Sequence, residues 1–352
     1  MRQSNTTIAI PPGETIKEQL EDREMSQKEF AARMELSEKH VSKLINGEVQ
    51  LTPPVAEKLE MVLGVPADFW NSLEAIYREK LAKVEAENEM DEDMAIAKNL
   101  PIREMKSNKW IDFSSEKSSL VKALRQFFEI ARLTLLFEKP ELAPIVYRRQ
   151  SVSEKAGYAL LAWAQQAKRE ARKVETKRIN LDLLRERLPE IKKLSILQPE
   201  DFCPKLTEML AACGIAIVFL PHIKGSFLHG AAFRDGKKIV VGLTVRGKYA
   251  DTFWFSLFHE LAHILHDDIN KPEGVSEQEE RDADAFARQT LIPDDDFAAF
   301  VLKKDFSRKA VMAFAEKQQV LSGVVIGRLQ VEKHISFSAH NSKDIRPKYE
   351  IA

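Results

Sequence analysis

Cysteine is scarce in this sequence: Cys203 and Cys213 are the only two in 352 residues, and neither forms a close pair with another cysteine or a histidine. This scarcity excludes both a disulfide scaffold and a thiolate zinc knuckle. No apolar run reaches the roughly 18 residues that a membrane span requires, so no membrane segment is expected. The N-terminal residues lack the basic start, apolar core and small-residue cleavage site of an export signal, which makes the cytoplasm the expected location.

The chain also has little net charge, -1, but its charges are unevenly placed. Lys and Arg number 12 against 20 Asp and Glu in residues 1–100, 21 against 13 in residues 101–200, and 20 against 21 in residues 201–352. Such blocks indicate separate units rather than one mixed surface. The basic middle third is either a set of solvated helix faces or a surface for phosphates or for the acidic first third.

The segment from Ser26 to Asn46 has the spacing of a helix-turn-helix. Ser26 and Glu29 predict a capping box at the first helix, and Ser37 and Gly47 mark the start and the stop of the second. A structural helical hairpin is the alternative that this pattern leaves open. The residues expected to meet base edges and phosphates are Ser26, Gln27, Ser37, Glu38, Lys39, His40, Ser42 and Lys43.

From Pro11 to Tyr77 the chain resembles the Xre-type helix-turn-helix of HigA antitoxins, including the Asn46-Gly47 turn. The resemblance implies sequence-specific binding of double-stranded DNA at a palindromic operator, by a homodimer, with a toxin as a further partner. The chain departs from that family at Glu35, where Gly is usual in a turn that favours a left-handed backbone, so we expect slight strain. Residues 1–80 hold 10 basic and 14 acidic side chains, so DNA binding by this module alone should be modest.

A second site lies in the apolar stretch WFSLFHELAHILHDD, from Trp254 to Asp268. His259 and His263 are four residues apart, hence on one helical face, where both imidazoles can bind one zinc ion. Glu260 lies beside them, where it can act as the general base on the attacking water. Buried polar groups need partners, and a metal is the simplest partner for these three.

A catalytic zinc ion requires a third protein ligand and an open position for water. The stretch SEQEERDADAFARQTLIP predicts a helix that presents Glu280 and Asp284 on one face. We assign Glu280 as the third ligand and Asp284 as the carboxylate that orients a ligand imidazole. Glu277, Glu279 and His266 remain alternative ligands, and His266 can instead cap its helix or line the cleft. His229, His222 and Tyr249 are candidate donors to the oxyanion, with a core or surface role as the alternative for each.

These two stretches are similar to those of the ImmA/IrrE family of metallopeptidases, and the resemblance covers roughly residues 203–330. It implies a zincin-like domain with a small sheet, and a zinc-dependent endopeptidase that cleaves a protein or peptide substrate, either itself or a partner repressor. Together with the N-terminal module, the chain resembles fusion regulators that combine both domains and are associated with toxin-antitoxin pairs. We expect a substrate peptide to lie along an exposed strand, either KKIVVGLTV or its hairpin partner HGAAF.

The predicted fold class is α+β, and the chain divides into five parts. They are an N-terminal all-α helix-turn-helix domain (1–80), an acidic linker (81–115), a basic helical middle region (116–200), a zincin-like metallopeptidase domain (201–310), and a C-terminal helical hairpin with a tail (311–352). The hairpin echoes the helix-turn-helix, with Arg328 as the one outward base on its second helix, which favours a structural or docking element over a DNA reader.

Three functions fit these features. The first is a regulator that is also a site-specific endopeptidase. The second is an antitoxin and autorepressor whose zinc domain is a largely non-catalytic scaffold that binds a toxin. The third is a general peptidase tethered to DNA. The presence of Glu260 favours the first, because a scaffold needs metal ligands but no general base.

Overall fold

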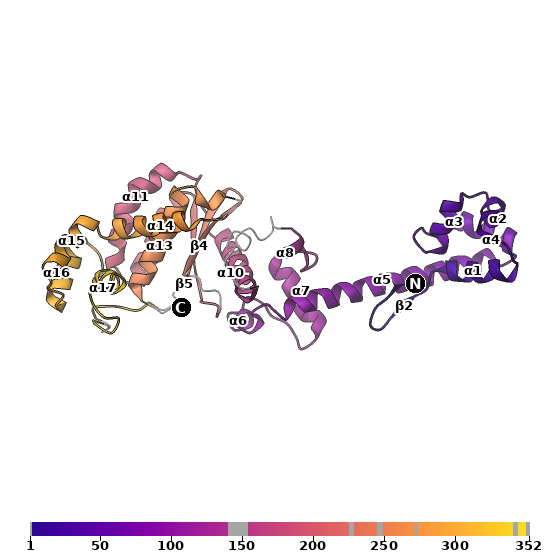
Figure 1. Ribbon diagram of the computed structural model, residues 1–352, viewed down its shortest axis with the longest axis horizontal. Coiled ribbons are helices and arrows are strands. Elements are labelled where there is room, and N and C mark those ends of the chain that lie inside the picture. The colour runs from indigo at the N-terminus through magenta and orange to yellow at the C-terminus, as the bar shows by residue number, and fades with distance from the viewer. Residues whose placement is uncertain are drawn as a thin grey trace. The chain divides into compact units, whose positions relative to one another are not determined.

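The computed structural model of the chain describes residues 2–139, 154–224, 229–244, 249–271, 274–340 and 344–349. It divides into two compact units, Met1–Ile96 and Ala97–Ala352. Both helices and small sheets are present, so the predicted α+β class is confirmed (Figure 1). Among the described residues, no helix combines the length and the apolarity that crossing a bilayer requires.

The first unit is a small helical domain preceded by a two-stranded antiparallel sheet. Its elements are β1 (Arg2–Gln3), β2 (Ile8–Ala9), α1 (Pro12–Asp22), α2 (Gln27–Arg33), α3 (Glu38–Ile45), α4 (Pro53–Leu63) and α5 (Ala67–Ala97). Phe30, Met34, Leu59 and Trp70 are fully buried between the helices. Gly13 allows α1 to approach α3, since a Cβ there would lie 1.8 Å from the carbonyl oxygen of Ile45.

The predicted capping box at α2 is only half formed. The backbone N–H of Glu29 donates to Ser26 Oγ at 3.2 Å, as expected. The Glu29 carboxylate, however, pairs with Arg33 one turn later at 2.7 Å. Ser26 therefore caps the helix without the reciprocal bond that the sequence pattern predicted.

The acidic segment 81–115 differs from the predicted linker, because α5 continues through it to Ala97 and is followed by α6 (Ile102–Ser107). Its Ala, Glu, Lys and Met residues favour helix even without a strong apolar stripe. Leu81 and Val84 also pack with Ala9 of the N-terminal sheet, and Glu87 accepts hydrogen bonds from the side chains of Thr6 and Thr7, between β1 and β2. Residues 6–9 thus cover one side of α5, in a segment for which the sequence predicted no packing partner.

The second unit contains a three-stranded sheet among helices. Its remaining elements are α7 (Lys117–Phe128), α8 (Leu135–Glu138), α10 (Glu154–Arg172), α11 (Leu181–Lys193), η2 (Leu194–Ile196), α12 (Pro199–Ala212), β3 (Ile215–Leu220), β4 (Gly230–Asp235), β5 (Lys238–Thr244), α13 (Ala250–Leu265), η3 (Asp268–Asn270), α14 (Glu277–Leu291), α15 (Asp294–Leu302), α16 (Arg308–Gln318) and α17 (Ser322–Val331). The predicted boundaries at 115/116, 200/201 and 310/311 all fall inside this compact unit. The middle region is helical where the structure describes it, and residues 140–153 lie outside the described part.

The sheet order is β3-β5-β4, with β3 parallel and β4 antiparallel to the central strand. The predicted hairpin forms, but its turn lies at Gly236-Lys237, one residue later than the predicted Asp235-Gly236, with Gly236 at φ +60°. The central strand β5 pairs with a strand on each side, so it offers no free edge to a substrate peptide. The prediction that KKIVVGLTV could bind the peptide was therefore wrong. The hairpin partner β4 is an outer strand of the sheet, and no strand among the described residues pairs with its other side.

Helices cover both faces of this sheet, α10 on one side and α13 on the other (Figure 1). On the α10 side, Trp163 packs over Gly242, where a Cβ would lie 2.4 Å from the indole ring. On the other side, Val241 and Leu243 join the core cluster that contains Trp254 and Phe258 of α13. The sheet therefore anchors α13, the helix that carries the two predicted histidine ligands.

The described C-terminal residues 344–349 hold the N-terminal end of α13. The backbone N–H of Ala250 donates to the carbonyl oxygen of Pro347 at 3.0 Å, and Trp254 Nε1 donates to Tyr349 Oη at 3.0 Å. This contact fixes the start of α13, two and a half turns before His259.

Candidate functional site

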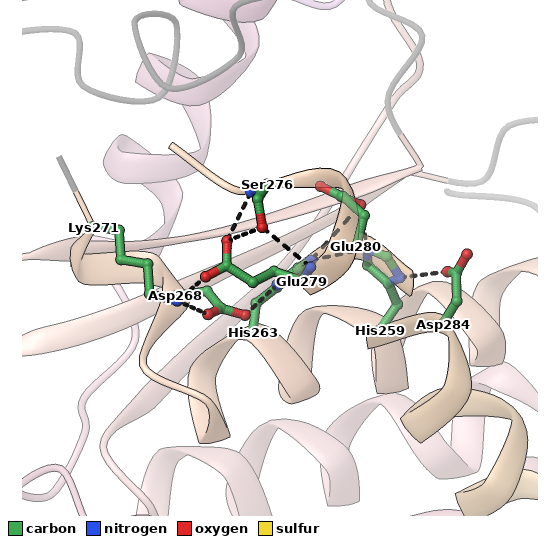
Figure 2. Close-up of polar contacts among 8 residues, drawn as sticks. All are labelled: His259, His263, Asp268, Lys271, Ser276, Glu279, Glu280 and Asp284. Carbon is green, nitrogen blue, oxygen red and sulfur yellow. Dashed lines mark hydrogen bonds and ion pairs between the residues drawn. The ribbon is translucent and has the colours of Figure 1, made fainter. Parts of the chain in front are cut away.

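The two predicted histidine ligands lie side by side on one face of α13 (Figure 2). Their Nε2 atoms are 3.1 Å apart. His263 is buried and His259 has a side chain that is 17% exposed. The apolar residues on the rest of α13 pack into the core of the second unit. The two histidines lie on the remaining side of the helix.

Glu280 reaches the histidines from the first turn of α14. Its Oε2 lies 3.3 Å from His259 Nε2 and 3.9 Å from His263 Nε2. A complete capping box between Ser276 and Glu279 starts this helix, which fixes the position of Glu280 one residue later. His259, His263 and Glu280 are the one group in the described part of the chain whose ligand atoms converge as a metal site requires.

The alternative ligands lie elsewhere. Glu277 pairs with Arg281 at 3.6 Å, and the Glu279 carboxylate is bound by Ser276 and Lys271. His266 is exposed at the C-cap of α13, with its ring 5.8 Å from that of Phe286.

Each ligand histidine is oriented by a carboxylate on its other ring nitrogen. Asp284 Oδ1 lies 2.8 Å from His259 Nδ1, which is the contact that the sequence predicted for Asp284. Asp268 Oδ2 lies 2.9 Å from His263 Nδ1, a contact that sequence reasoning missed. The signal was present in the sequence, because Asp268 follows His263 by five residues, in the turn that ends the helix.

These bonds determine what the site can bind. When each Nδ1–H donates to a carboxylate, both Nε2 atoms carry lone pairs and cannot hydrogen-bond to each other. A cation between them removes the repulsion. Ligand atoms of a tetrahedral zinc site lie roughly 3.3 Å apart for bonds of about 2.0–2.1 Å, close to the distances among these three residues. The donor set therefore fits zinc, with two imidazoles and one carboxylate.

The charges of this group are strongly coupled. Burial disfavours the charged form of His259, but the carboxylates of Asp284 and Glu280 outweigh it and raise its pKa to about 10. When no cation is bound and the rings are protonated, hydrogen bonds from His259 and His263 hold the pKa of Glu280 well below its usual range. Glu280 is thus ionised at neutral pH, as a metal ligand must be.

A second ion pair supports the Asp268 carboxylate. Lys271 donates to Asp268 Oδ1 at 2.7 Å and also contacts Glu279 (Figure 2). The ammonium of Lys271 lowers the pKa of Glu279 to about 2. This chain of contacts ties η3, which carries Asp268, to the first turn of α14, which carries Glu280.

Glu260 is buried beside the ligand pair, with 6% of its surface exposed. A Cβ on Gly230, the first residue of β4, would lie 3.0 Å from Glu260 Cγ and 3.2 Å from its Oε1. A larger residue at this position would crowd Glu260 and Leu243, whose Cδ2 would lie 2.8 Å from the added Cβ. The free edge strand therefore begins directly at the predicted general base.

A cleft of about 600 Å³ opens next to these residues, between α13, α14 and α17. His229 is exposed and lies on its wall, as a candidate oxyanion donor should. Tyr249 and His222 are not among the lining residues. The Tyr249 ring lies under Arg346, whose guanidinium carbon is 3.9 Å from the ring centroid.

In the first unit, the residues predicted to contact DNA lie at the surface of α2, α3 and their N-caps. His40 is partly exposed and the other seven are exposed: Ser26, Gln27, Ser37, Glu38, Lys39, Ser42 and Lys43. Glu35 adopts φ +50°, as predicted for the turn where the HigA-like family has Gly. Lys58 donates to the carbonyl oxygen of Met34 at 3.1 Å and to Glu35 at 3.3 Å, which holds this turn from α4.

The predicted C-terminal hairpin forms from α16 and α17, but its second helix faces inward. Val324, Val325, Ile326 and Leu329 are buried in the core of the second unit. Arg328, expected to point outward, has a side chain only 10% exposed and donates to the carbonyl oxygen of Ile292 at 2.6 Å. The hairpin is thus a wall of the cleft, and the outward orientation predicted for Arg328 was wrong.

Comparison with known proteins matches both units. A helix-turn-helix family model matches residues 16–70, and a model of the IrrE N-terminal-like domain matches residues 231–329. An uncharacterised HTH-type transcriptional regulator of Escherichia coli (strain K12), YddM, is 38% identical over 63 residues, which cover 18% of this chain and 67% of that protein. The chain therefore belongs to the Xre-type helix-turn-helix family of DNA-binding regulators and carries, in the same polypeptide, a metallopeptidase-like domain of the IrrE/ImmA type.

Proposed function

We propose that the protein is an operator-binding regulator with a zinc-dependent, site-specific endopeptidase domain, which cleaves either itself or a partner repressor. The observation that carries this proposal is the convergence of His259, His263 and Glu280 beside Glu260 at the end of a cleft. A purely structural metal site is closed by its ligands and has no need of an adjacent buried carboxylate.

Zinc held by these ligands would polarise the scissile carbonyl and the attacking water. The chain's own groups have separate tasks. Glu260 takes the proton from the water and delivers it to the leaving amine. Asp284 and Asp268 accept the Nδ1 protons of His259 and His263, so that each Nε2 lone pair points inward.

The free edge of β4 supports an extended substrate. A peptide that pairs with this edge would lie against the strand that begins at Gly230 and would therefore pass over Glu260. His229, the residue immediately before, is the remaining candidate for a donor to the oxyanion.

The proposed DNA target is a palindromic operator bound by a homodimer through α3. The exposed Lys39 and Lys43 would contact phosphates, and Ser42 and His40 would meet base edges. Residues 1–80 carry more acidic than basic side chains, so one copy gains little phosphate affinity. A gel shift that shows no preference for the protein's own promoter over random DNA would contradict this part of the proposal.

The peptidase is tested with the full-length protein, as wild type and as Glu260→Gln, both loaded with zinc. Each is incubated alone and with a library of unstructured peptides, and the products are identified by mass spectrometry. We expect discrete products from the wild type and none from Glu260→Gln at equal zinc content.

The alternative is an antitoxin and autorepressor whose zinc domain binds a toxin without turnover. This function requires the three ligands but not the general base. It predicts that Glu260→Gln and wild type behave alike in every assay, including derepression of the operator in cells.

A further inference from the structure

The cleft has walls of different chemistry. Phe255 from α13, Leu291 from α14 and Val324 from α17 supply apolar surface. Arg288, Arg328 and Arg346 bring three guanidinium groups to the same space. The cleft is also lined by acidic residues, so we ask which of the three arginines are already neutralised within the protein.

Two of these arginines are paired within the protein. Arg346 forms a buried ion pair with Asp251 at 2.8 Å, with side chains only 11% and 10% exposed. Arg328 pairs with Asp294 and, at 2.8 Å, with Glu332.

The acidic residues of the cleft are also committed. Asp251 and Glu332 bind these two arginines, and Asp284 accepts from His259. The fourth acidic residue of the cleft is Glu260, which is the proposed general base.

Arg288 is different. It is partly buried in α14, one turn beyond Asp284 on the face that lines the cleft, and no hydrogen bond or ion pair joins its guanidinium to any residue that the structure describes. A guanidinium on the wall of a cleft, without a partner in the protein, can bind a carboxylate of a ligand through two parallel hydrogen bonds. Asp284, one turn earlier on the same helix, contacts His259 through Oδ1 and forms no ion pair with Arg288 among the described residues.

We propose that Arg288 binds an acidic side chain of the peptide substrate, close to the scissile bond, and so determines the specificity of the cleft. This inference rests on the proposed peptidase function. One helical turn separates Arg288 from Asp284, a rise of about 6 Å. An extended peptide advances about 3.3 Å per residue, so the acidic residue lies within roughly two positions of the bond over the metal.

The apolar walls specify the neighbours of that acidic residue. Phe255, Leu291 and Val324 offer surface to an aliphatic or aromatic side chain beside it. The substrate class is therefore an extended segment with one acidic residue among apolar ones, and basic residues at that position are rejected by Arg288.

The test uses peptide hydroxamates, which attach to the metal and need no turnover to be measured. Two series are made, one with a C-terminal and one with an N-terminal hydroxamate, each with Leu, Glu, Gln or Lys at the first or the second position from the hydroxamate. Binding to zinc-loaded full-length protein is measured by calorimetry for the wild type, Arg288→Gln, Arg288→Lys and Arg281→Gln. Arg281 is the matched control, an exposed arginine on the same helix that pairs with Glu277 outside the cleft.

In at least one series, the wild type and Arg281→Gln should bind the Glu compound about tenfold or more tighter than the Gln compound. Arg288→Gln should lose this difference, and Arg288→Lys should keep part of it. Equal binding of the Glu and Gln compounds by the wild type overturns the role of Arg288 but leaves the peptidase intact. Failure of every hydroxamate to bind the zinc-loaded protein overturns both.

Discussion

His263 and Asp268 form a buried pair in which Asp268 Oδ2 lies 2.9 Å from His263 Nδ1. The other carboxylate oxygen of Asp268 accepts from Lys271 at 2.7 Å. Both oxygens of Asp268 are thus engaged, and the imidazole of His263 has one tautomer and one orientation available to it. The pair fixes Nε2 toward the proposed metal.

The first prediction concerns this pair. Asp268→Asn should weaken zinc binding about 10- to 100-fold, because an amide supports the ligand tautomer less well than a carboxylate. Competition with a chromogenic chelator measures the change. Asp267→Asn is the matched control, since Asp267 is exposed and bonds to Asn270 instead. Equal zinc affinity in the two variants would show that the carboxylate has no orienting role.

The second prediction concerns the space at Gly230. Gly230→Ala should lower peptide hydrolysis at least tenfold without loss of zinc, because the new methyl group would lie 2.8 Å from Leu243 Cδ2 and 3.0 Å from Glu260 Cγ and would shift the general base. Gly323→Ala is the control, since the nearest atom to a Cβ there is 3.5 Å away. Unchanged turnover in Gly230→Ala at full zinc content would contradict the assignment of Glu260.

The third prediction concerns the turn between α2 and α3. Glu35→Gly should raise the free energy of unfolding of the helix-turn-helix unit by about 1 kcal/mol, because Gly adopts the φ of +50° without strain. The ion pair between Glu35 and Lys58 would be lost, but Glu35 is exposed and the pair contributes little. Urea denaturation measures the change. A lower midpoint in Glu35→Gly would mean that the turn carries no strain.

The fourth prediction concerns pH and Cys203. Burial raises the pKa of the Cys203 thiol to about 11, so the thiol remains protonated at pH 8. Labelling by iodoacetamide should be slow at pH 8 and accelerate as the pH approaches 11. Because the folded-state pKa is raised, the corresponding contribution to stability is complete below the unfolded pKa and is lost between about pH 9 and 11. Fast labelling of Cys203 in the folded protein at pH 8, located by peptide mapping, would contradict this environment.

Several elements were predictable from the sequence because they depend on local signals. The helix starts at Ser26 and Ser37, the strand β3 and the hairpin between β4 and β5 all follow from capping, β-branched and turn residues. The placement of Glu280 and Asp284 on one face follows from helical periodicity alone.

Other features depend on contacts between distant segments. The long α5 is covered by residues near Ala9, some seventy positions earlier, and local composition carries no sign of that. The edge position of β4 is set by the parallel pairing of β3 with β5, which no periodicity reveals. Arg328 faces inward because Ile292 and Asp294, on a neighbouring segment, accept its hydrogen bonds.

The central claim is tested most directly by the metal content of the purified full-length protein. The account predicts about one zinc ion per chain in the wild type and in Glu260→Gln, and a large loss of zinc in His259→Ala and Glu280→Ala. Wild-type protein that binds no zinc, or Glu280→Ala that binds it as tightly as the wild type, would contradict the site.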